Sequence, residues 1–588
     1  MQELIADVLV VGGGTGGTAA AIQAARRGAK TILVSEFSWL GGMLTSAGVT
    51  APDGNELAAF QTGIWGAFLR ELEQRQPEGL DNAWVSFFTY EPRIGAEIFA
   101  DWVKALPNLQ WISGQIPEAV LRENDCILGV EFQTVRIKAK ITIDATELGD
   151  LLELGNIPYR WGWELQAEFD EPSAPIEHNQ LTQTYPVQAP TWVVVMRDFG
   201  ESKAPPIPQP LNYNPAKFQN AWINDEAAAF LNYGRLPGNR FMINWPISGN
   251  DYGEGVERLL DRHTRSHFHQ EAKNHSLSFA HFIQTQLGDR YGLAEDTFPT
   301  GAFAIHPYYR ESRRLIGITT LREQDLLPKG LVAPLPFRVE AIGCEYAENF
   351  CQSIAVGNYA NDHHYPSGDI ALKPKSIRWG GRWTGTPFTI PYPCLVPQAI
   401  DNFLVCEKNI SVTHIANGAT RLQPVVLGIG QAAGMAAALC VEQNCQPREL
   451  NVRSLQLALV TDETVPAAIF PLFNLIPSHP EWQHWQRYYI DHPESYPNSG
   501  ECPAKAWVQA SSKTAQSFSG IFECKDVQDY TLTTIDNLEQ CWSIVSVQAE
   551  IDAKLQQLQS GQLLKGFGKY NHAGNWILVE ALDLNYSQ

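Results

Sequence analysis

A glycine-rich segment near the N-terminus constrains the fold more than any other feature of the sequence. The apolar run Val8–Val11 precedes six residues in a GxGxxG pattern: Gly12, Gly13, Gly14, Thr15, Gly16 and Gly17. Gly12 permits a tight turn, Gly14 lets the backbone approach a pyrophosphate, and Gly17 lets helix and strand pack closely. The alanine-rich helix expected over Thr18–Arg27 would offer free N–H groups to phosphate.

The position of Glu36 indicates which kind of dinucleotide this loop holds. Glu36 ends the next expected strand, which begins at Lys30, about 20 residues after the glycines. A carboxylate at this point can bind both hydroxyls of an adenosine ribose. Because the pattern lies between an expected strand and an expected helix, it is far more specific than a lone GxGxxG. The segment predicts a dinucleotide with an unphosphorylated adenosine ribose.

A second glycine-rich loop distinguishes between nicotinamide and flavin dinucleotides. A nicotinamide-binding unit would normally continue into its next strand after Glu36. The sequence instead has Gly41, Gly42 and Met43 in a loop suited to passing backbone beside a flat ring system. No second Rossmann unit follows, because the glycines after Pro424 lie inside an expected helix. The cofactor is therefore expected to be a flavin rather than a nicotinamide dinucleotide.

Two later segments are expected strands that return the chain to the dinucleotide-binding domain. Ile141–Asp144 is an expected strand that ends in Ala145-Thr146. Asn402–Val405 is another, and it leads into Gly418–Pro424 and then into an expected helix over Pro424–Leu439. Proline is a natural first helical residue, and the N-terminus of that helix would face the flavin N1–C2=O edge.

Together these segments resemble the family of FAD-dependent oxidoreductases, with the glutathione-reductase type of FAD fold and a relation to the fumarate reductase branch. The resemblance spans roughly residues 5–460. It departs from the family pattern at Glu147, where many relatives have Gly or a Tyr-Glu pair, and at Cys406-Glu407, which replaces Ala-Gly. The resemblance implies FAD contacts from these residues: Gly12, Gly14, Thr15, Gly16, Gly17, Glu36, Gly41, Gly42, Met43, Ala145, Thr146, Asp150, Arg421, Gln423 and Pro424.

The expected fold is α/β, with a three-layer Rossmann-type FAD-binding domain, an inserted α+β substrate domain and a small C-terminal α+β unit. Proline-rich, polar composition over Glu168–Asn214 marks the insertion. In the tail, a helix is expected near Ser546–Gln559 and a strand at Asn575–Val579. The predicted divisions are 1–160 for the first part of the FAD-binding domain, 161–375 for the substrate domain, 376–465 for the last part of the FAD-binding domain, 466–515 for a connector and 516–588 for the C-terminal domain.

Charge and composition narrow the partners and the location. The net charge of −21 argues against nucleic acid or an anionic membrane, which need concentrated Lys and Arg. The first residues lack a basic n-region, and no apolar stretch is expected to reach the ~20 residues of a membrane span. The ten cysteines include no CxxC, so a disulfide framework is not expected. These features favour a cytoplasmic protein acting on a small molecule, and they leave the oligomeric state open.

His364 is the first candidate for chemistry. It follows Asp362 and His363, and the resemblance places this D-x-H pattern near the flavin. Histidine is the side chain most easily tuned near neutral pH, so His364 is a candidate acid/base. The alternative is a structural, hydrogen-bonded histidine. Adjacent histidines rarely converge on one ion, and no Cys or Glu stands at ligand spacing, so no metal site is expected.

Four further residues complete the candidate set. Arg310 is expected either to clamp a substrate carboxylate in bidentate geometry or to pair with a neighbour such as Glu311. Tyr392 stands stiffly between two prolines and is a candidate neighbour of the flavin ring. His414 and Arg421 resemble the His and Arg that orient ligands in fumarate-reductase-like sites. A separate patch of arginine and tryptophan over residues 378–383 is either a packing surface for flavin or substrate, or a surface loop.

The sequence therefore predicts an FAD-dependent oxidoreductase that oxidises a small polar substrate at a CH–OH or CH–NH centre, with hydride transfer to flavin N5 and His364 as the base. The segment Met43–Ser46 offers no His, Cys or Tyr for covalent attachment, so the FAD is expected to be non-covalent. The electron acceptor remains open among oxygen, a quinone and a protein. The other functions considered are an isomerase or lyase without net oxidation and a non-catalytic flavin-binding scaffold.

Overall fold

The computed structural model of the chain describes residues 1–222, 227–337, 350–505, 515–535 and 540–583. Its centre is a seven-stranded sheet with strand order β3-β2-β1-β6-β5-β4, in which β17 also pairs with β6. Strands β1, β2, β3, β6 and β17 pair in parallel, whereas β4 and β5 extend the sheet in antiparallel fashion. The bounds are β1 Gln2–Val11, β2 Thr31–Ser35, β3 Leu109–Ser113, β4 Pro117–Glu123, β5 Cys126–Phe132, β6 Val135–Asp144 and β17 Phe403–Val405.

The strand, glycine loop and helix predicted at the N-terminus are present. The apolar run Val8–Val11 is fully buried in β1, between β2 and β6. Helix α1 (Thr15–Arg26) follows the loop, and α10 (Gln423–Gln443) packs along α1. Their close contact depends on missing side chains, because a Cβ on Gly430 would lie 2.2 Å from the carbonyl oxygen of Gly16. The parallel sheet and this packing confirm a Rossmann-type α/β fold.

Helix α10 departs from one expectation. By length and composition it is apolar enough to cross a membrane, and 89% of its most apolar window is buried inside the protein. The expectation that no apolar stretch reaches that length was therefore wrong for this segment. Its burial against the central sheet explains the composition, because a helix in a protein core is apolar on all sides.

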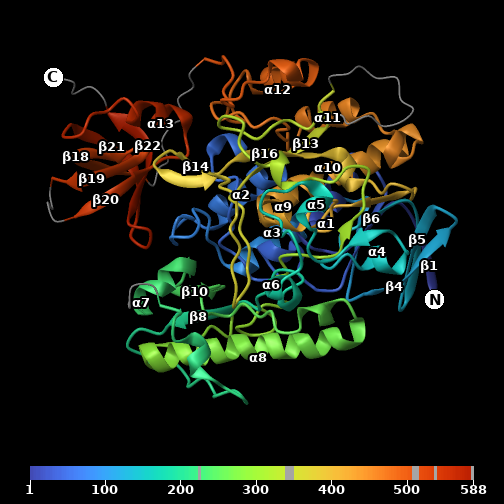
Figure 1. The fold of residues 1–588 in the computed structure, drawn as a ribbon, viewed down its shortest axis with the longest axis horizontal. Coiled ribbons are helices and arrows are strands. Elements are labelled where there is room, and N and C mark those ends of the chain that lie inside the picture. The colour runs from blue at the N-terminus through green and yellow to red at the C-terminus, as the bar shows by residue number, and fades with distance from the viewer. Residues whose placement is uncertain (223–226, 338–349, 506–514, 536–539, 584–588) are drawn as a thin grey trace.

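The middle of the chain forms a second sheet with the order β11-β8-β10-β9. Its strands are β8 Val194–Asp198, β9 Arg235–Leu236, β10 Arg240–Ile243 and β11 Tyr291–Leu293. The long helix α8 (Arg262–Leu287) lies beneath β8 and β10 (Figure 1). It begins later than the predicted Val256, because a separate short turn of helix covers Val256–Leu259. Ala280 and Ile283 are buried in its core face, as the helical spacing predicts.

The remaining helices before the tail are short and lie around the two sheets. Those predicted near residues 57–74 and 93–106 are present as α2 and α3. The helices are α2 Gly63–Arg75, α3 Pro92–Lys104, α4 Asp150–Leu154, α5 Gln166–Phe169, α6 Gln180–Thr184, α7 Ala227–Phe230, α9 His414–Thr420, α11 Val452–Val460 and α12 Trp482–Asp491. The paired strands outside the main sheets are β7 Tyr159–Arg160 with β12 Arg314–Leu315, β13 Ser353–Asn358 with β16 Pro387–Pro391, and β14 Ser376–Trp379 with β15 Arg382–Gly385.

The tail is a closed five-stranded barrel with the order β18-β19-β20-β22-β21. Its elements are β18 Gln516–Asp526, β19 Asp529–Thr534, β20 Cys541–Val545, α13 Ala549–Leu555, β21 Leu563–Asn571 and β22 Trp576–Asp583. Sequence reasoning identified α13 and β22 but missed the other strands. The alternation of Phe518, Gly520 and Phe522 toward the barrel interior was the available signal.

The barrel is docked on the rest of the protein through the β14–β15 hairpin, which lies beside it in Figure 1. The two N–H groups of the hairpin turn donate to the barrel, Gly380 to Asp552 Oδ1 at 3.0 Å and Gly381 to Gln528 Oε1 at 3.1 Å. The Ser546 N–H donates back to the Gly380 carbonyl at 2.7 Å. A glycine turn therefore joins the two parts by backbone contact.

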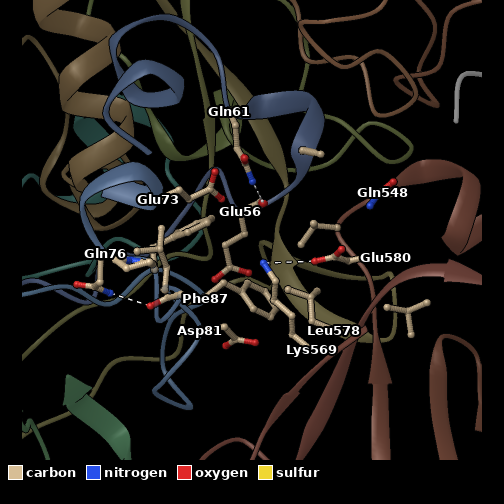
Figure 2. Close-up of a pocket in the computed structure, with 17 residues that line it drawn as sticks. Glu56, Gln61, Glu73, Gln76, Asp81, Phe87, Gln548, Lys569, Leu578 and Glu580 are labelled. Atoms are coloured by element: carbon tan, nitrogen blue, oxygen red, sulfur yellow. Dashed lines mark hydrogen bonds and ion pairs between the residues drawn. The ribbon is translucent and has the colours of Figure 1, made fainter. Parts of the chain in front are cut away.

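A second joint is formed around Asp81. Its carboxylate accepts hydrogen bonds from Asn571 Nδ2 at 2.5 Å and from Trp576 Nε1 at 3.1 Å, both in the barrel. Burial raises the pKa of Asp81 to about 6. Figure 2 shows the cavity beside this joint, of about 460 Å³, with Glu56 and Asp81 on one side and Lys569 of the barrel on the other. The barrel is thus fixed at two places on the rest of the chain.

We expect Gly381→Ala to loosen the barrel. A Cβ on Gly381 would lie 2.1 Å from the Ile544 carbonyl oxygen, and its φ of +84° disfavours any other residue. Such backbone strain alone costs roughly 1–3 kcal/mol. Hydrogen exchange measured by mass spectrometry should therefore become faster in peptides covering β14, β15 and β20.

Gly561→Ala is the matched control. Gly561 has a similar φ of +89° in a barrel turn, but nothing lies within 4 Å of a Cβ there. In the Gly561→Ala variant, the β14–β15 hairpin should exchange at the same rate as in the wild-type protein. Equal exchange of the hairpin in both variants would show that the Gly381 contact does not hold the barrel in place.

Candidate functional site

A cavity runs along the carboxyl ends of β1, β2 and β6, where parallel α/β sheets bind ligands. It brings together residues predicted from two separate motifs. Those of the predicted cofactor set that line it are Gly12, Gly14, Glu36, Ala145, Thr146 and Asp150. Arg265, His306 and Tyr309 from the middle of the chain form part of its wall. Sequence reasoning missed these three, because nothing in their local pattern marks them.

The glycines of the first loop form a cradle that a side chain would fill. At Gly12, where φ is +115°, a Cβ would lie 2.0 Å from the carbonyl oxygen of Ala145. At Gly17 a Cβ would lie 2.0 Å from the carbonyl oxygen of Gly12. The loop therefore closes against the end of β6 and leaves its backbone along the cavity, as a pyrophosphate requires.

Glu36 stands at the end of β2 with its side chain open to the cavity. Among the described residues it makes no hydrogen bond or ion pair, so its carboxylate is free for a ribose. Asp150, in contrast, pairs with Arg265 at 2.8 Å and with Arg313 at 3.2 Å. It lines the cavity, yet its carboxylate is already engaged with two arginines.

The second glycine loop packs directly on the first. Gly41 has φ +103°, and its carbonyl accepts a hydrogen bond from Thr15 Oγ1 at 2.8 Å. Gly42 also has a positive φ, and a Cβ there would lie 2.7 Å from the Thr15 nitrogen. Met43 follows and is fully buried. Two of the predicted cofactor segments thus meet at Thr15.

No side chain that the structure describes caps the N-terminus of α10 by a hydrogen bond to its backbone N–H groups. Its N-cap residue Leu422 provides no side-chain cap, and Pro424 occupies the first turn. The Gln423 Oε1 atom is buried without a hydrogen-bond partner in the described structure. A helix N-terminus stabilises negative charge, and the flavin N1–C2=O edge carries such charge. This unpartnered atom, the glycine cradle and the free Glu36 carboxylate fit FAD.

The two positions that depart from the family pattern meet at a single lysine. Lys408 Nζ lies 2.6 Å from Glu147 Oε2 and 3.2 Å from Glu407 Oε2. Glu407 Oε1 also accepts a hydrogen bond from the Gly16 N–H at 2.6 Å. One of the N–H groups at the start of α1 is therefore taken by a carboxylate, beside the place where a pyrophosphate would lie. The local sequence did not indicate this triad.

The two glutamates of the triad ionise differently. Burial opposes ionisation of Glu147, but the charge of Lys408 outweighs it and lowers the pKa of Glu147. Burial raises the pKa of Glu407 to about 7, and Glu147 contributes to the rise. Lys408 and Glu147 therefore form the ion pair, and Glu407 changes charge near neutral pH.

Beyond the two glycine loops, five side chains form a line in which the two carboxylates alternate with two arginines and a histidine. Arg310 lies 3.1 Å from Asp251, and His364 Nδ1 lies 2.6 Å from the other Asp251 oxygen. His364 Nε2 lies 2.8 Å from Asp362 Oδ2, which also accepts from Arg421 at 2.9 Å. Four of the five side chains are almost buried, whereas 40% of the Asp362 side chain is exposed. Three of the predicted residues, His364, Arg310 and Arg421, thus lie in one cluster.

The two aspartates of this cluster are ionised. Burial would raise the pKa of Asp251, but Arg310 and His364 outweigh it and lower that pKa to about 2. Burial also opposes ionisation of Asp362, and His364 together with Arg421 brings its pKa below its usual range. Because an ionised Asp251 only accepts hydrogen bonds, His364 Nδ1 is the donor in their contact. Asp251 was missed from sequence, since 113 residues separate it from His364.

The other two predicted residues lie elsewhere. His414 is buried between Glu311, 2.9 Å from Nδ1, and the Tyr365 hydroxyl, 2.5 Å from Nε2. Burial lowers the pKa of His414 well below its usual range, so its ring is neutral. The Tyr392 hydroxyl donates to the Pro447 carbonyl at 2.8 Å, and no described contact joins it to the cluster. Arg310 pairs with Asp251 and not with Glu311.

Comparison with known proteins agrees with the predicted cofactor. A family model described as FAD dependent oxidoreductase matches residues 7–459. No curated protein matches the chain. A geranylgeranyl bacteriochlorophyll reductase-like structure from Thermoplasma acidophilum is 10% identical over 75% of this chain and 80% of that chain, with a TM-score of 0.32.

Two further solved structures are similar over smaller parts. Thioredoxin reductase from T. acidophilum is 20% identical over 24% of this chain and 36% of that chain, with a TM-score of 0.16. L-Proline dehydrogenase from P. horikoshii is 13% identical over 34% of this chain and 63% of that chain, with a TM-score of 0.23. The chain therefore spans less than two thirds of the length of both.

We expect Glu36→Ala to weaken FAD binding by roughly 1.5–3 kcal/mol, the range for hydrogen bonds to a charged group. The carboxylate is free and lies at the ribose end of the cavity. Titration of the apoprotein with FAD, followed by tryptophan fluorescence, measures the change. Glu3→Ala, at the other end of β1, is the control and should bind FAD like the wild type. Equal affinity of all three proteins would remove Glu36 from the site.

Glu407→Gln should strengthen FAD binding. The amide still accepts from Gly16, but it removes a carboxylate beside the pyrophosphate. Like charges about 10 Å apart at an effective dielectric constant of about 20 repel by roughly 1.7 kcal/mol. Because the pKa of Glu407 is about 7, the proton is lost as pH rises through that value. Wild-type affinity should therefore fall from pH 6 to pH 8.

The Gln variant should lack this pH dependence, since its amide does not ionise. Glu442→Gln, on the exposed end of α10, is the matched control and should keep it. A wild-type affinity for FAD that is constant between pH 6 and pH 8 would contradict the assignment of Glu407.

Proposed function

The chain belongs to the FAD dependent oxidoreductase family, and from this premise we propose that it oxidises a small polar substrate at a CH–OH or CH–NH centre. FAD is its cofactor and supplies the redox chemistry, as the acceptor of a hydride at flavin N5. We propose that this FAD is bound without a covalent link. The predicted division into an FAD-binding domain, an inserted substrate domain and a C-terminal domain is part of the same proposal.

The observation that supports this function is the position of His364 between two carboxylates. Asp251 lies 2.6 Å from Nδ1 and is fully buried, whereas Asp362 lies 2.8 Å from Nε2 and is partly exposed. The two ring nitrogens therefore face different surroundings. Nδ1 faces a fully buried carboxylate, and Nε2 faces one whose side chain is 40% exposed.

The ionised Asp251 determines what His364 can do. By accepting from Nδ1–H it fixes the ring orientation. Nε2 faces the ionised Asp362, so it can accept a substrate proton only when it carries no proton itself and that carboxylate has turned away. After Nε2 takes a proton from a substrate hydroxyl or amine, Asp251 stabilises the resulting imidazolium. Asp362 must turn away from Nε2 for this step, which its exposed side chain permits.

The arginines at both ends balance the charge of this arrangement. Arg310 donates to the Ala189 carbonyl at 2.5 Å and to Asn244 at 3.2 Å, so its position is fixed from several sides. Arg310 is buried and paired with Asp251. These contacts favour a role in orienting Asp251, the carboxylate that contacts His364, and not a direct contact with the substrate. Arg421 holds Asp362 in place and remains the arginine nearer to the exposed side of the cluster.

His364→Ala should slow flavin reduction by roughly 10²–10⁴-fold, the usual contribution of general acid–base catalysis. A substrate is first found by an anaerobic metabolite screen that records flavin bleaching, and the rate is then measured by stopped flow. FAD affinity should remain unchanged, because the FAD cavity does not include His364.

His263→Ala is the control, since His263 is an exposed histidine at the start of α8. Reduction of the His364→Ala flavin at the wild-type rate would make His364 a structural residue and move the base to His414. A product with the mass of the substrate, formed without flavin bleaching, would instead favour an isomerase or lyase.

A further inference from the structure

A second cavity lies where the barrel meets the hairpin. It has a volume of about 470 Å³, within the size range of small-molecule sites. We call it the aromatic cavity, because four large rings line it: Trp84, Tyr359, Trp383 and Trp576. The rings come from the FAD-binding part, the chain after β13, the hairpin and the barrel. No single part of the protein forms this cavity.

The charged groups of the aromatic cavity are paired, with one exception. Arg382 lies 3.8 Å from Glu56, and Arg378 lies 3.6 Å from Asp529 of the barrel. Asp53 also lines the cavity, yet it has no hydrogen bond or ion pair among the described residues. Burial raises its pKa well above the usual range, and Glu56 adds to the rise. An unpaired carboxylate in such surroundings is costly unless a cation or a proton joins it.

The rings of this cavity already accommodate cations. The Arg378 guanidinium lies 4.8 Å from the centre of the Trp383 ring, and that of Arg382 lies 4.9 Å from the centre of Trp576. Tyr359 has no ring contact and no hydrogen bond through its hydroxyl in the part of the chain that the structure describes. Its half-buried side chain lines the cavity, and aromatic faces attract cations. The net charge of −21 also draws cations toward the protein.

The aromatic cavity lies close to the His364 cluster. Tyr359 is three residues before Asp362, and the charge of Asp362 contributes to raising the pKa of the Tyr359 hydroxyl. Asp362 and Arg421 also affect the ionisation of Asp53. Asn361 lies between Tyr359 and Asp362 in the sequence, and the nitrogen and oxygen of its buried amide have no hydrogen-bond partner in the described structure. The segment that lines the cavity at Tyr359 and Ala360 thus continues directly into Asp362 of the His364 cluster.

We propose that the aromatic cavity is the substrate site and that the substrate is an organic amine, bound as its ammonium ion by the Asp53 carboxylate and the face of Tyr359. This inference rests on the proposed function and narrows its reacting centre to CH–NH. It also gives the barrel a role, because Trp576 completes the wall of the site.

The reaction balances with FAD as the oxidant. His364 first takes one proton from the ammonium, which leaves the neutral amine R₂CH–NH₂. The C–H bond then breaks, and its two electrons leave with the hydrogen and reduce FAD. The nitrogen lone pair forms the second C–N bond, so the product is the iminium ion R₂C=NH₂⁺. The Asp53 carboxylate balances the charge of the ammonium substrate before this step and that of the iminium product after it.

The test uses three probes with one ring and different head groups: benzylamine, benzyl alcohol and benzoate. They are titrated anaerobically into the FAD-loaded protein, and binding is followed by quenching of tryptophan fluorescence. Benzylamine should bind at least roughly tenfold more tightly than benzyl alcohol, and benzoate more weakly than both.

Asp53→Asn should bind benzylamine no better than benzyl alcohol, while its affinity for benzyl alcohol stays unchanged. Asp526→Asn, an exposed aspartate of the barrel, is the matched control and should behave like the wild type. Trp383→Ala, at an exposed ring of the cavity, should weaken the binding of both neutral and cationic probes. Since Asn has nearly the size of Asp, an unchanged preference for benzylamine in Asp53→Asn would overturn the assignment.

The outcomes separate this inference from the proposed function. Equal binding of benzyl alcohol and benzylamine, or tighter binding of benzoate, contradicts the amine site even if some alcohol reduces the flavin. Selective binding of benzylamine that depends on Asp53 supports the site. If amines bind in this way and no substrate reduces the flavin in the metabolite screen, the site remains and the proposed oxidation fails.

Discussion

The close backbone contact at the end of β1 is the constraint on which the rest of this structure depends. A Cβ on Gly16 would lie 1.8 Å from the Cys406 carbonyl oxygen, and one on Gly12 would lie 2.0 Å from that of Ala145. Three segments separated by hundreds of residues meet there only because side chains are missing. This contact places the glycine loop before α1 beside the end of β6, and both line one cavity at the carboxyl ends of the parallel strands.

Two buried networks of charged side chains lie around this backbone contact. Removing one member of such a network leaves its partner as an unpaired buried charge. The triad of Lys408 with two glutamates lies at the glycine loop, where Glu407 accepts from the Gly16 N–H, and the line from Arg310 to Arg421 is the second network. In both, cations and carboxylates alternate, which keeps buried carboxylates such as Asp251 ionised. Asp251 and its partners are thus positioned before a ligand arrives, whereas Asp362 is the carboxylate that has to move in the proposed step.

The parts predictable from sequence are those with local signals. The strand, glycine loop and helix of residues 8–26 have a fixed spacing, and the apolar runs of β6 and β17 follow the same logic. His364 was identified from its Asp-x-His pattern. Asp251 and Lys408 were not, because their partners lie far away in the chain and no periodicity records a contact. The barrel was missed for a related reason: the pairings that close it, such as β18 with β21, join segments far apart in the chain.

The barrel therefore has to be understood from its contacts and not from its own pattern. It binds the Gly380-Gly381 turn through Asp552 and Gln528, and the same hairpin carries Arg378 and Arg382. Arg378 pairs with Asp529 of the barrel, and Arg382 lies over the ring of Trp576. The last two contacts involve the side chains of Arg378, Arg382 and Trp576, which line the aromatic cavity. The barrel thus contributes to the wall of the aromatic cavity through Ser543, Val545 and Trp576.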